Sequence, residues 1–372
     1  MAGIPLNYVL FGSSTGYGQS AQDMVFSLIN SGKYDIRIEV LFKNKPDYRG
    51  MTDDRKNIME SLRLKPLSKD MIQVLHCIPP IQRHASKLAK TIGWGLFETF
   101  SPPNGAKSGW INILNKNDAI ATPSHFDYKV FAHEKLTKPL YRVPASIDTN
   151  LFNTNVEPLV KRDKFTFLYF GTWRKRKGYP ELLETWYRNF SSKDGVQLLI
   201  KTDKTEHAMS YVRKIKHDLG FDKKDIAPIL FENKVLDEIE LPRFFKSVDC
   251  LISPTRGEGF GLPGLQCMAL GIPIIITDFS GCQDYATEDT CTLIKPAGFV
   301  LVPSMDGLPQ FSQCKWPYIT TGEIGNKMQY VLNNFGIVQK KAEYAANFVS
   351  KEFSYEQSAE KFDQMIREVY NL

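Results

Sequence analysis

The order of apolar and polar positions in the first half of the chain predicts strands that alternate with helices. Apolar runs at 4–11 (IPLNYVLF) and 34–42 (YDIRIEVLF) are typical of strands, and residues 20–31 between them have the apolar spacing of a helix. Three further runs are strand-like: MIQVLHCI at 71–78, AIATP at 119–123 and LYRVP at 140–144. Such alternation favours parallel strands joined by crossover helices.

The second half of the chain repeats this plan. Its strand patterns lie at 164–171, 196–202, 227–233 and 249–255, with helix patterns between them at 179–190, 206–220 and 240–248. A chain of 372 residues also exceeds the range in which one core usually keeps growing. We therefore predict an α/β protein with two tandem, Rossmann-like, doubly wound parallel sheets. The polar stretch 148–164 marks the boundary, which gives domains at 1–158 and 159–350 and a final helix within 351–372.

Composition narrows the class of protein. No apolar run approaches the roughly 20 residues of a membrane-spanning helix, and the first residues lack the features of a secretion signal, so we expect a cytoplasmic protein. The six cysteines show no Cys-x-x-Cys pair and no metal-ligand spacing, which is typical of core thiols. Most of the net charge of +6 lies in residues 1–158. This basic excess indicates either a solvated face or weak association with an anionic surface, such as nucleic acid, phosphoglycan or lipid headgroups.

Glycines follow the first predicted strand in FGSSTGYGQSAQ, which contains Gly12, Gly16 and Gly18. At the carboxyl end of a parallel strand, such glycines let the backbone approach a ligand, although a tight turn without a ligand fits them as well. The spacing is neither that of a P-loop nor G-x-G-x-x-G. The next strand ends in basic residues where a nicotinamide cofactor needs a ribose-binding acid, which argues against an oxidoreductase, although fold alone does not exclude one.

A second loop, FGTWRKRKGYPELL, carries four consecutive cations, Arg174 to Lys177, between a strand and a helix. Cations at a helix N-terminus oppose the helix dipole, so they favour a bound anion there; a solvated basic turn is the alternative.

The third loop is PTRGEGFGLPGLQCMALGIPIIITD at 254–278. Glu258 stands here among Gly257, Gly259 and Gly261, between a buried strand and an apolar helix. The glycines leave this carboxylate accessible to a ligand, whereas a plain helix cap is the structural alternative.

Together these loops resemble the retaining glycosyltransferases of GT-B fold, in particular the large family 4. The resemblance rests on EGFGLP with a following Gly-Ile-Pro at 271–273, and on the G-T-x-x-x-R-K-G element at 171–178. The segments LNKNDAIATPSHF and VPASIDTNLF are similar to the family's D-x-x-x-x-P-S strand and P-x-G-x-D-x-x-x-F linker, with Ser146 in place of glycine. The resemblance covers essentially the full chain and includes a final helix that crosses back to the first domain.

The resemblance implies metal-independent, retaining transfer of a hexose from a UDP- or GDP-sugar to the hydroxyl of a glycan, glycolipid or other glycoconjugate. Domain 1–158 would bind the acceptor and domain 159–350 the donor. Glu258 would contact the donor sugar, and Lys177 and Arg176 would neutralise the leaving diphosphate. Glu98, which we expect at the end of the strand in KTIGWGLFETFSPP, is a candidate to orient or deprotonate the acceptor. No cofactor beyond the donor substrate and no metal ligand is expected, because the sequence has no Asp-x-Asp motif.

The family's second glutamate is replaced here by Gln266, a neutral and weaker hydrogen-bond partner for the nucleotide ribose. The residues that the resemblance places against the donor are Gly16, Gly18, Gly171, Thr172, Asn233, Lys234, Gly259, Phe260, Gly261, Leu262 and Gln266.

Two other functions stay open. Gln266 fits a non-catalytic protein that binds a nucleotide sugar or glycan on the same fold, and the basic first half fits sugar transfer to a modified nucleic acid. His76 is a second candidate for acceptor chemistry, although a lone histidine at a strand end is more often structural. Trp94, Trp110 and Trp173 fit core packing better than stacking on a sugar or base.

Overall fold

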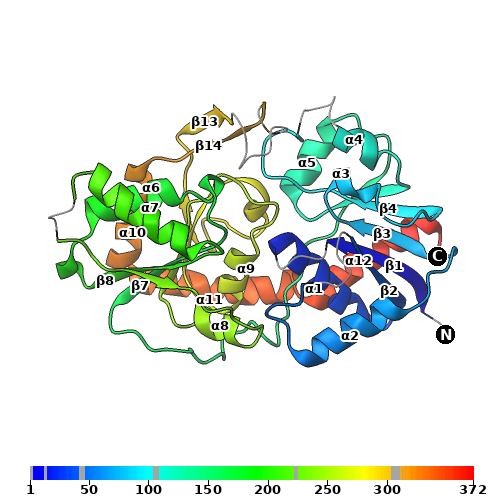
Figure 1. Cartoon of the computed structure of the whole chain (residues 1–372), viewed down its shortest axis with the longest axis horizontal. Helices are drawn as coiled ribbons and strands as arrows, with labels where there is room; N and C mark the ends of the chain where they lie inside the picture. The colour runs from blue at the N-terminus through cyan, green and yellow to red at the C-terminus, as the bar shows by residue number, and fades with distance from the viewer. Residues whose placement is uncertain are drawn as a thin grey trace. The chain divides into compact units, whose positions relative to one another are not determined.

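The structure is a computed structural model of the chain. It describes residues 3–11, 15–41, 47–103, 109–221, 225–302, 311 and 313–372. The chain folds into two compact units, which the colours of Figure 1 allow the reader to follow. Unit 1 comprises Met1–Thr149 and Ser350–Leu372, and unit 2 comprises Asn150–Val349.

Unit 1 is built on a six-stranded parallel sheet with the strand order β2-β1-β3-β4-β5-β6. Its strands are β1 (Ile4–Phe11), β2 (Tyr34–Leu41), β3 (Ile72–His76), β4 (Lys90–Trp94), β5 (Ala119–Thr122) and β6 (Leu140–Arg142). The chain passes from β1 to β2 and then returns to β3 on the other side of β1. The carboxyl ends of β1 and β3 therefore flank the point where the winding direction reverses.

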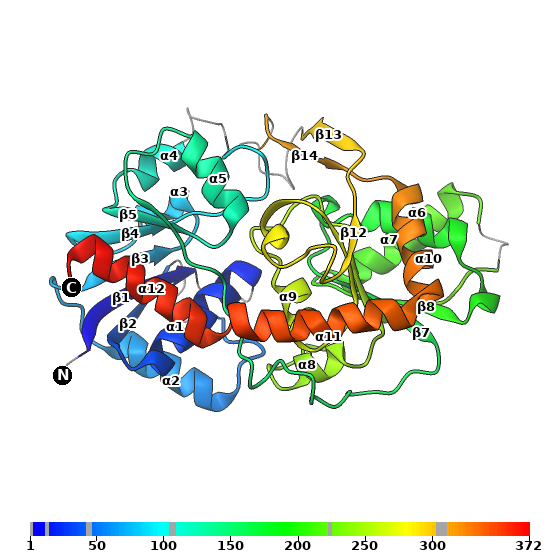
Figure 2. The same cartoon turned by 180° about the vertical axis from the view of Figure 1, so that it is seen from behind.

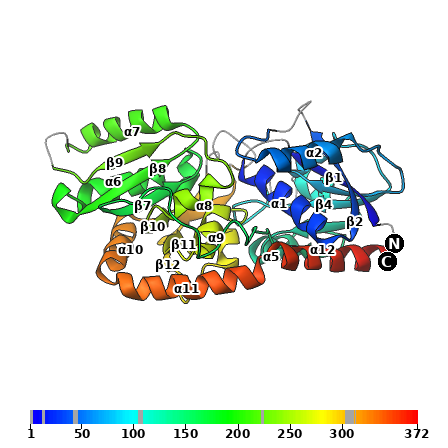
Figure 3. The same ribbon diagram turned by 90° about the horizontal axis from the view of Figure 1, so that it is seen from below.

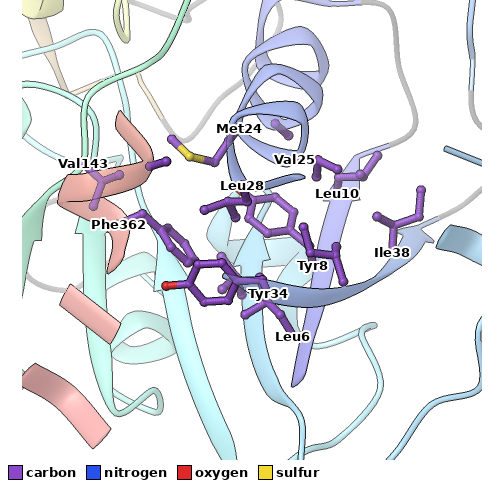
Figure 4. Packing of buried hydrophobic residues seen from close by; sticks show 14 of the residues in the cluster. Leu6, Tyr8, Leu10, Met24, Val25, Leu28, Tyr34, Ile38, Val143 and Phe362 are labelled. Atoms are coloured by element: carbon purple, nitrogen blue, oxygen red, sulfur yellow. The ribbon is translucent and has the colours of Figure 1, made fainter. Parts of the chain in front are cut away.

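The helices of unit 1 complete its core. They are α1 (Gly16–Ser31), α2 (Asp53–Leu64), α3 (Pro79–Gln82), α4 (Gly109–Leu114), α5 (His125–His133) and α12 (Tyr355–Tyr370). Met24 and Leu28 of α1 are buried in one cluster with Tyr8 of β1. Figure 4 shows this cluster, in which Phe362 of α12 lies beside Tyr34, with 5.6 Å between the ring centroids.

The final helix α12 belongs to unit 1, although the chain reaches it from unit 2. It lies along α1, as Figures 2 and 3 show. The Ser354 hydroxyl caps its first turn by accepting from the Gln357 N–H. The Tyr34 hydroxyl donates to the Asp363 carboxylate at 2.9 Å. The prediction of a final helix that crosses back to the first domain is confirmed.

Unit 2 has a second six-stranded parallel sheet, with the order β12-β11-β10-β7-β8-β9. Its strands are β7 (Phe165–Phe170), β8 (Val196–Lys201), β9 (Ile229–Glu232), β10 (Cys250–Ser253), β11 (Ile274–Thr277) and β12 (Thr292–Ile294). Here the winding reverses between β7 and β10. The loops that follow these two strands are the basic loop at 171–178 and the glutamate loop at 254–261, so the sheet brings both sequence motifs to one edge.

Six helices and three short 3₁₀ turns complete unit 2 in the described part of the chain. They are α6 (Tyr179–Asn189), α7 (Thr205–Asp218), α8 (Glu240–Phe245), α9 (Leu262–Ala269), α10 (Thr321–Asn333), α11 (Phe335–Glu352), η2 (Lys175–Lys177), η3 (Ser192–Asp194) and η4 (Ser280–Asp284). Helix α11 carries the chain out of unit 2. An antiparallel hairpin of β13 (Gly298–Leu301) and β14 (Lys315–Tyr318) also belongs to unit 2, and the sequence analysis did not predict it.

The first crossing between the units lies at Thr149–Asn150, earlier than the boundary expected after residue 158. The difference arises because the polar segment after residue 150 bonds to unit 2. The Leu159 N–H donates to the Arg243 carbonyl at 2.9 Å, and both Leu159 and Val160 donate to the Ser247 hydroxyl. No helix in the described ranges has the length and apolar character needed to cross a membrane.

Candidate functional site

The basic loop and the glutamate loop of unit 2 are in direct backbone contact. Gly178, at the end of η2, has a φ of +74°. A Cβ atom at this position would lie 1.9 Å from the Pro254 carbonyl oxygen, so only glycine fits. This close approach sets the last residue of the basic turn against the start of the glutamate loop.

Glu258 and Lys177 form a buried ion pair at this contact. The Lys177 Nζ lies 2.6 and 2.7 Å from the two carboxylate oxygens of Glu258, and the Arg176 Nη1 lies 3.6 Å from Oε2. The Glu258 side chain is only 10% exposed. Burial by itself raises the pKa of Glu258, but Lys177 and Arg176 together outweigh it, and the pKa lies below its usual value. The site therefore holds a charged carboxylate and two cations.

A third segment, after β11, fixes the backbone of Glu258. The Glu258 N–H donates to the Ser280 hydroxyl at 2.8 Å, and its carbonyl accepts from the Gly281 N–H at 3.0 Å. Ser280 has a φ of +65°, which is unusual for a residue other than glycine. A Cβ at Gly281 would lie 2.1 Å from the Gly259 carbonyl oxygen. This segment was not predicted from the sequence, where its signal is the Ser-Gly pair that follows the β11 strand.

The start of α9 follows directly after the glutamate loop. Gly261 has a φ of +88°, and its carbonyl accepts from the Tyr285 hydroxyl at 2.6 Å. Leu262 and Pro263 form the first turn of α9, and Gln266 is buried one turn further along. Phe260 is buried and its ring lies 5.7 Å from that of Tyr285.

Gly171 lies at the same site. It follows β7 with a φ of +152°, and a Cβ there would lie 3.8 Å from the Lys177 side chain. The Thr172 carbonyl accepts from the Tyr169 hydroxyl at 3.3 Å. The structure therefore brings together in unit 2 the predicted site residues from the basic loop, the glutamate loop and the start of α9: Gly171, Thr172, Arg176, Lys177, Glu258, Gly259, Phe260, Gly261, Leu262 and Gln266.

The other predicted site residues lie on other elements of the two units. Asn233 and Lys234 are exposed in the loop after β9, where Lys234 forms an ion pair with Glu240. In unit 1, Gly16 begins α1, and the Gly18 N–H donates to the capping hydroxyl of Thr15 at 3.5 Å. Gly12 lies outside the described residues.

Glu98 is half-buried in the loop after β4. We expected it at the end of a strand, which is wrong, because β4 ends at Trp94. His76 is fully buried at the end of β3, with its Nδ1 2.6 Å from the Tyr8 hydroxyl and its ring stacked on Trp94. Burial lowers the pKa of His76 to about 3, so the imidazole is neutral and acts in packing.

Trp94, Trp110 and Trp173 are all buried, and Trp173 stacks on Tyr179 with 3.9 Å between ring centroids. The side chains that the structure describes include no group of three or more His, Cys, Asp or Glu residues placed to hold a metal ion.

Arg256 is a further residue of the site that the sequence analysis did not single out. It is buried, and its backbone N–H donates to the Arg176 carbonyl at 2.7 Å. Its Nη1 donates to the Lys175 carbonyl at 2.6 Å, and its Nη2 forms an ion pair with Glu181 of α6. Arg256 of the glutamate loop thus bonds to the basic loop, just as Lys177 of the basic loop bonds to Glu258 in the glutamate loop.

Comparison with solved structures identifies the architecture. HepE of Anabaena, solved in complex with UDP and glucose, superposes on 98% of this chain and 100% of its own with a TM-score of 0.69 and 11% identity. Sucrose-phosphate synthase of Thermosynechococcus elongatus gives a TM-score of 0.69 with 14% identity, over 99% of both chains. The chain has the GT-B fold. The predicted fold class is therefore confirmed.

The family match lies in the second half of this GT-B chain. Residues 164–308 match the family model of "Glycosyl transferases group 1". The O-antigen biosynthesis glycosyltransferase WclY of Escherichia coli is 25% identical over 179 residues, which is 44% of this chain and 50% of WclY. The chain thus spans about half the length of the first curated relatives that it matches. The matched family segment contains both loops of the site.

Proposed function

We propose that the chain is a glycosyltransferase that moves a sugar from a nucleotide diphosphate sugar to the hydroxyl of a glycan or glycoconjugate. The observation that carries this proposal is the buried Glu258–Lys177 pair at the strand edge where β7 and β10 end. The match of residues 164–308 to glycosyl transferases group 1 supports it, as does the UDP and glucose bound to the structurally similar HepE.

Lys177 and Arg176 supply the positive charge that the leaving diphosphate needs in this reaction. Negative charge grows on the diphosphate as it leaves, and fixed cations in a water-poor site stabilise it. Lys177 and Arg176 are 15% and 12% exposed, so solvent screens them little. The N–H groups of Gly261 and Leu262 would add hydrogen-bond donors. Because these groups supply the positive charge, we propose that transfer needs no metal ion.

Glu258 is the group that we assign to the donor sugar. Its charged carboxylate accepts hydrogen bonds from sugar hydroxyls and stabilises positive charge on the anomeric carbon as the bond to phosphate breaks. We propose that the acceptor attacks from the same face and that the departing phosphate oxygen takes its proton, so the anomeric configuration is retained. No strong protein base is then needed, and Glu98 would only orient the acceptor in unit 1.

The remaining assignments complete the proposed donor and acceptor sites. Gln266 accepts from a ribose hydroxyl through its amide oxygen, while Gly16, Gly18, Asn233 and Lys234 contact the donor. Unit 1 binds the acceptor, and its basic excess favours weak association with an anionic surface. We propose a cytoplasmic location, since all six cysteines are free buried thiols, as expected in a reducing compartment.

A thermal-shift screen with UDP, GDP, ADP and their sugars tests the donor proposal, because a ligand stabilises the folded state in proportion to ln(1 + [L]/Kd). Donors that bind are then incubated with the enzyme, with and without EDTA. Proton NMR of the product gives its anomeric configuration. A product of inverted configuration would refute retention, and loss of turnover with EDTA would refute metal independence.

A second function has its own support. In the family that this chain resembles, a charged glutamate that binds the donor nucleotide occupies the position of Gln266. The competing proposal is therefore a protein that binds nucleotide sugars without transferring them. Nucleotide binding with neither hydrolysis nor transfer for any donor would favour this second function.

A further inference from the structure

The 3₁₀ turn Lys175–Lys177 carries the proposed phosphate-binding cations, yet it is too short to hold its own conformation. It has three residues and two closing hydrogen bonds, from the Lys177 N–H to the Arg174 carbonyl at 2.9 Å and from the Gly178 N–H to the Lys175 carbonyl at 3.0 Å. The Arg176 carbonyl and the second lone pair of the Lys175 carbonyl are left for partners outside the turn. Arg256 supplies them: the backbone N–H bonds the Arg176 carbonyl at 2.7 Å and Nη1 bonds the Lys175 carbonyl at 2.6 Å.

Each of the two loops donates an arginine hydrogen bond to a backbone carbonyl of the other. The Arg176 guanidinium donates to the Gly257 carbonyl in the glutamate loop, while the Arg256 guanidinium donates to the Lys175 carbonyl in the basic turn. Each arginine therefore fixes the backbone of the opposite loop. Lys177 is the last residue of the turn, and Glu258 lies two residues beyond Arg256. These two arginine–carbonyl hydrogen bonds therefore set the distance between the lysine and the carboxylate.

The positive charge of Arg256 is itself neutralised. Its Nη2 forms an ion pair with Glu181, in the first turn of α6, and its guanidinium carbon lies 5.4 Å from the centre of the Trp316 ring in β14. The charge of Arg256 is therefore already paired with a carboxylate and covered by an aromatic face. What Arg256 provides to the site is geometry rather than charge.

We propose that Arg256 is a positioning residue: it does not touch the donor, and it holds Lys177 in line with the diphosphate by fixing the Lys175–Lys177 turn. This inference rests on the proposed function only for the identity of the group that Lys177 meets. It predicts that a lysine at position 256 cannot substitute, because one ammonium group cannot reach both the Lys175 carbonyl and the Glu181 carboxylate with the planar fork of arginine.

The test compares the wild type with Arg256→Lys, Arg256→Met and Glu181→Gln, and with Arg188→Gln as the control. Arg188 lies on α6 and forms an exposed ion pair with Glu184, so its loss changes charge but not the turn. Hydrogen exchange measured by mass spectrometry on peptides covering 171–181 reports the order of the turn without any substrate. Steady-state kinetics with a donor found in the screen reports kcat and KM.

We expect faster exchange at 171–181 in both Arg256 variants. We also expect a kcat lower by about 100-fold with a much smaller change in KM, because a displacement near 1 Å costs that much when the group acts in the transition state. Glu181→Gln keeps Arg256 but replaces its ion pair with a weaker, neutral hydrogen bond, so it should shift both readouts in the same direction by less. The Arg188→Gln protein should match the wild type.

Wild-type exchange and wild-type kcat in Arg256→Lys would overturn the inference, because charge alone would then suffice. Lost activity with unchanged exchange at 171–181 would overturn it too, since the turn would not depend on Arg256. If Arg256→Lys does not fold, Glu181→Gln decides in the same way. If the wild type binds no nucleotide, the proposed function fails, and the exchange data alone still support or refute the role of Arg256.

Discussion

The replacement Glu258→Gln should affect nucleotide binding and sugar transfer in opposite directions. Without a donor, Lys177 is held by both carboxylate oxygens of Glu258 at 2.6 and 2.7 Å. A diphosphate must therefore compete with Glu258 for the same ammonium group. Glutamine keeps the size and shape of the side chain but removes the charge, and Lys177 becomes free to meet the phosphates.

The size of the effect follows from the contact that is lost. A hydrogen bond to a charged group contributes about 1.5–3 kcal/mol net. Relief of this competition should tighten nucleoside diphosphate binding by roughly 10- to 100-fold in Kd, since about 1.4 kcal/mol corresponds to a factor of ten. The same variant lacks the charge that stabilises the anomeric carbon, so its kcat should fall by about 100-fold or more.

The first effect is measured by isothermal titration of the wild type and of Glu258→Gln. The ligand is the nucleoside diphosphate that gives the wild type its largest thermal shift. Turnover at saturating donor measures the second. Glu184→Gln is a matched control, because it neutralises a half-buried glutamate paired with Arg188 on α6. Unchanged or weaker nucleotide binding in Glu258→Gln would refute the reasoning, since Lys177 would then not be shared between carboxylate and phosphate.

The other predictions concern the same contact. Lys177→Ala should fold, bind the nucleoside diphosphate more weakly and lose about 100-fold or more in kcat, and wild-type turnover would contradict its role. Gly178→Ala should lower the free energy of unfolding by about 3 kcal/mol or more, because it adds a clash with the Pro254 carbonyl to the strain of a positive φ. Gly195→Ala, at a φ of +67° with open space around it, should lose only ~1–2 kcal/mol, and equal losses in chemical denaturation would refute the clash. The lowered pKa of Glu258 gives stability that is present above its usual value of 4.5 and is lost as the pH falls through its pKa in the folded protein, so denaturation followed against pH should show a shallower acid loss in Glu258→Gln.

The regular part of the fold follows from local patterns, which is why the sequence predicted it. Buried parallel strands are continuous apolar runs, and the helices between them are amphipathic, so both sheets and α12 leave clear signals. The β13–β14 hairpin does not, because Phe299, Val300, Leu301 and Tyr318 are large apolar side chains that stay partly exposed. Such residues give no reliable pattern of inward and outward positions.

The candidate site was predictable only in part, for a similar reason. Glu258, Lys177 and Arg176 stand in motifs whose glycines and cations are visible in the sequence, and unit 2 places them together. Arg256 and Ser280 work through backbone carbonyls and N–H groups of segments that are distant in sequence. Hydrogen bonds of that kind depend on the folded path of the chain, and no single-sequence pattern encodes them.

The two crossings of the chain, at Thr149–Asn150 and Val349–Ser350, have a consequence for biosynthesis. Phe362 is part of the core of unit 1, so that core remains incomplete on the ribosome until α12 has been made. Unit 2, which is contiguous in sequence, can fold first even though it is translated second. A nascent chain that stalls before residue 350 would therefore expose the apolar face of α1 and leave the amino-terminal half in need of a chaperone.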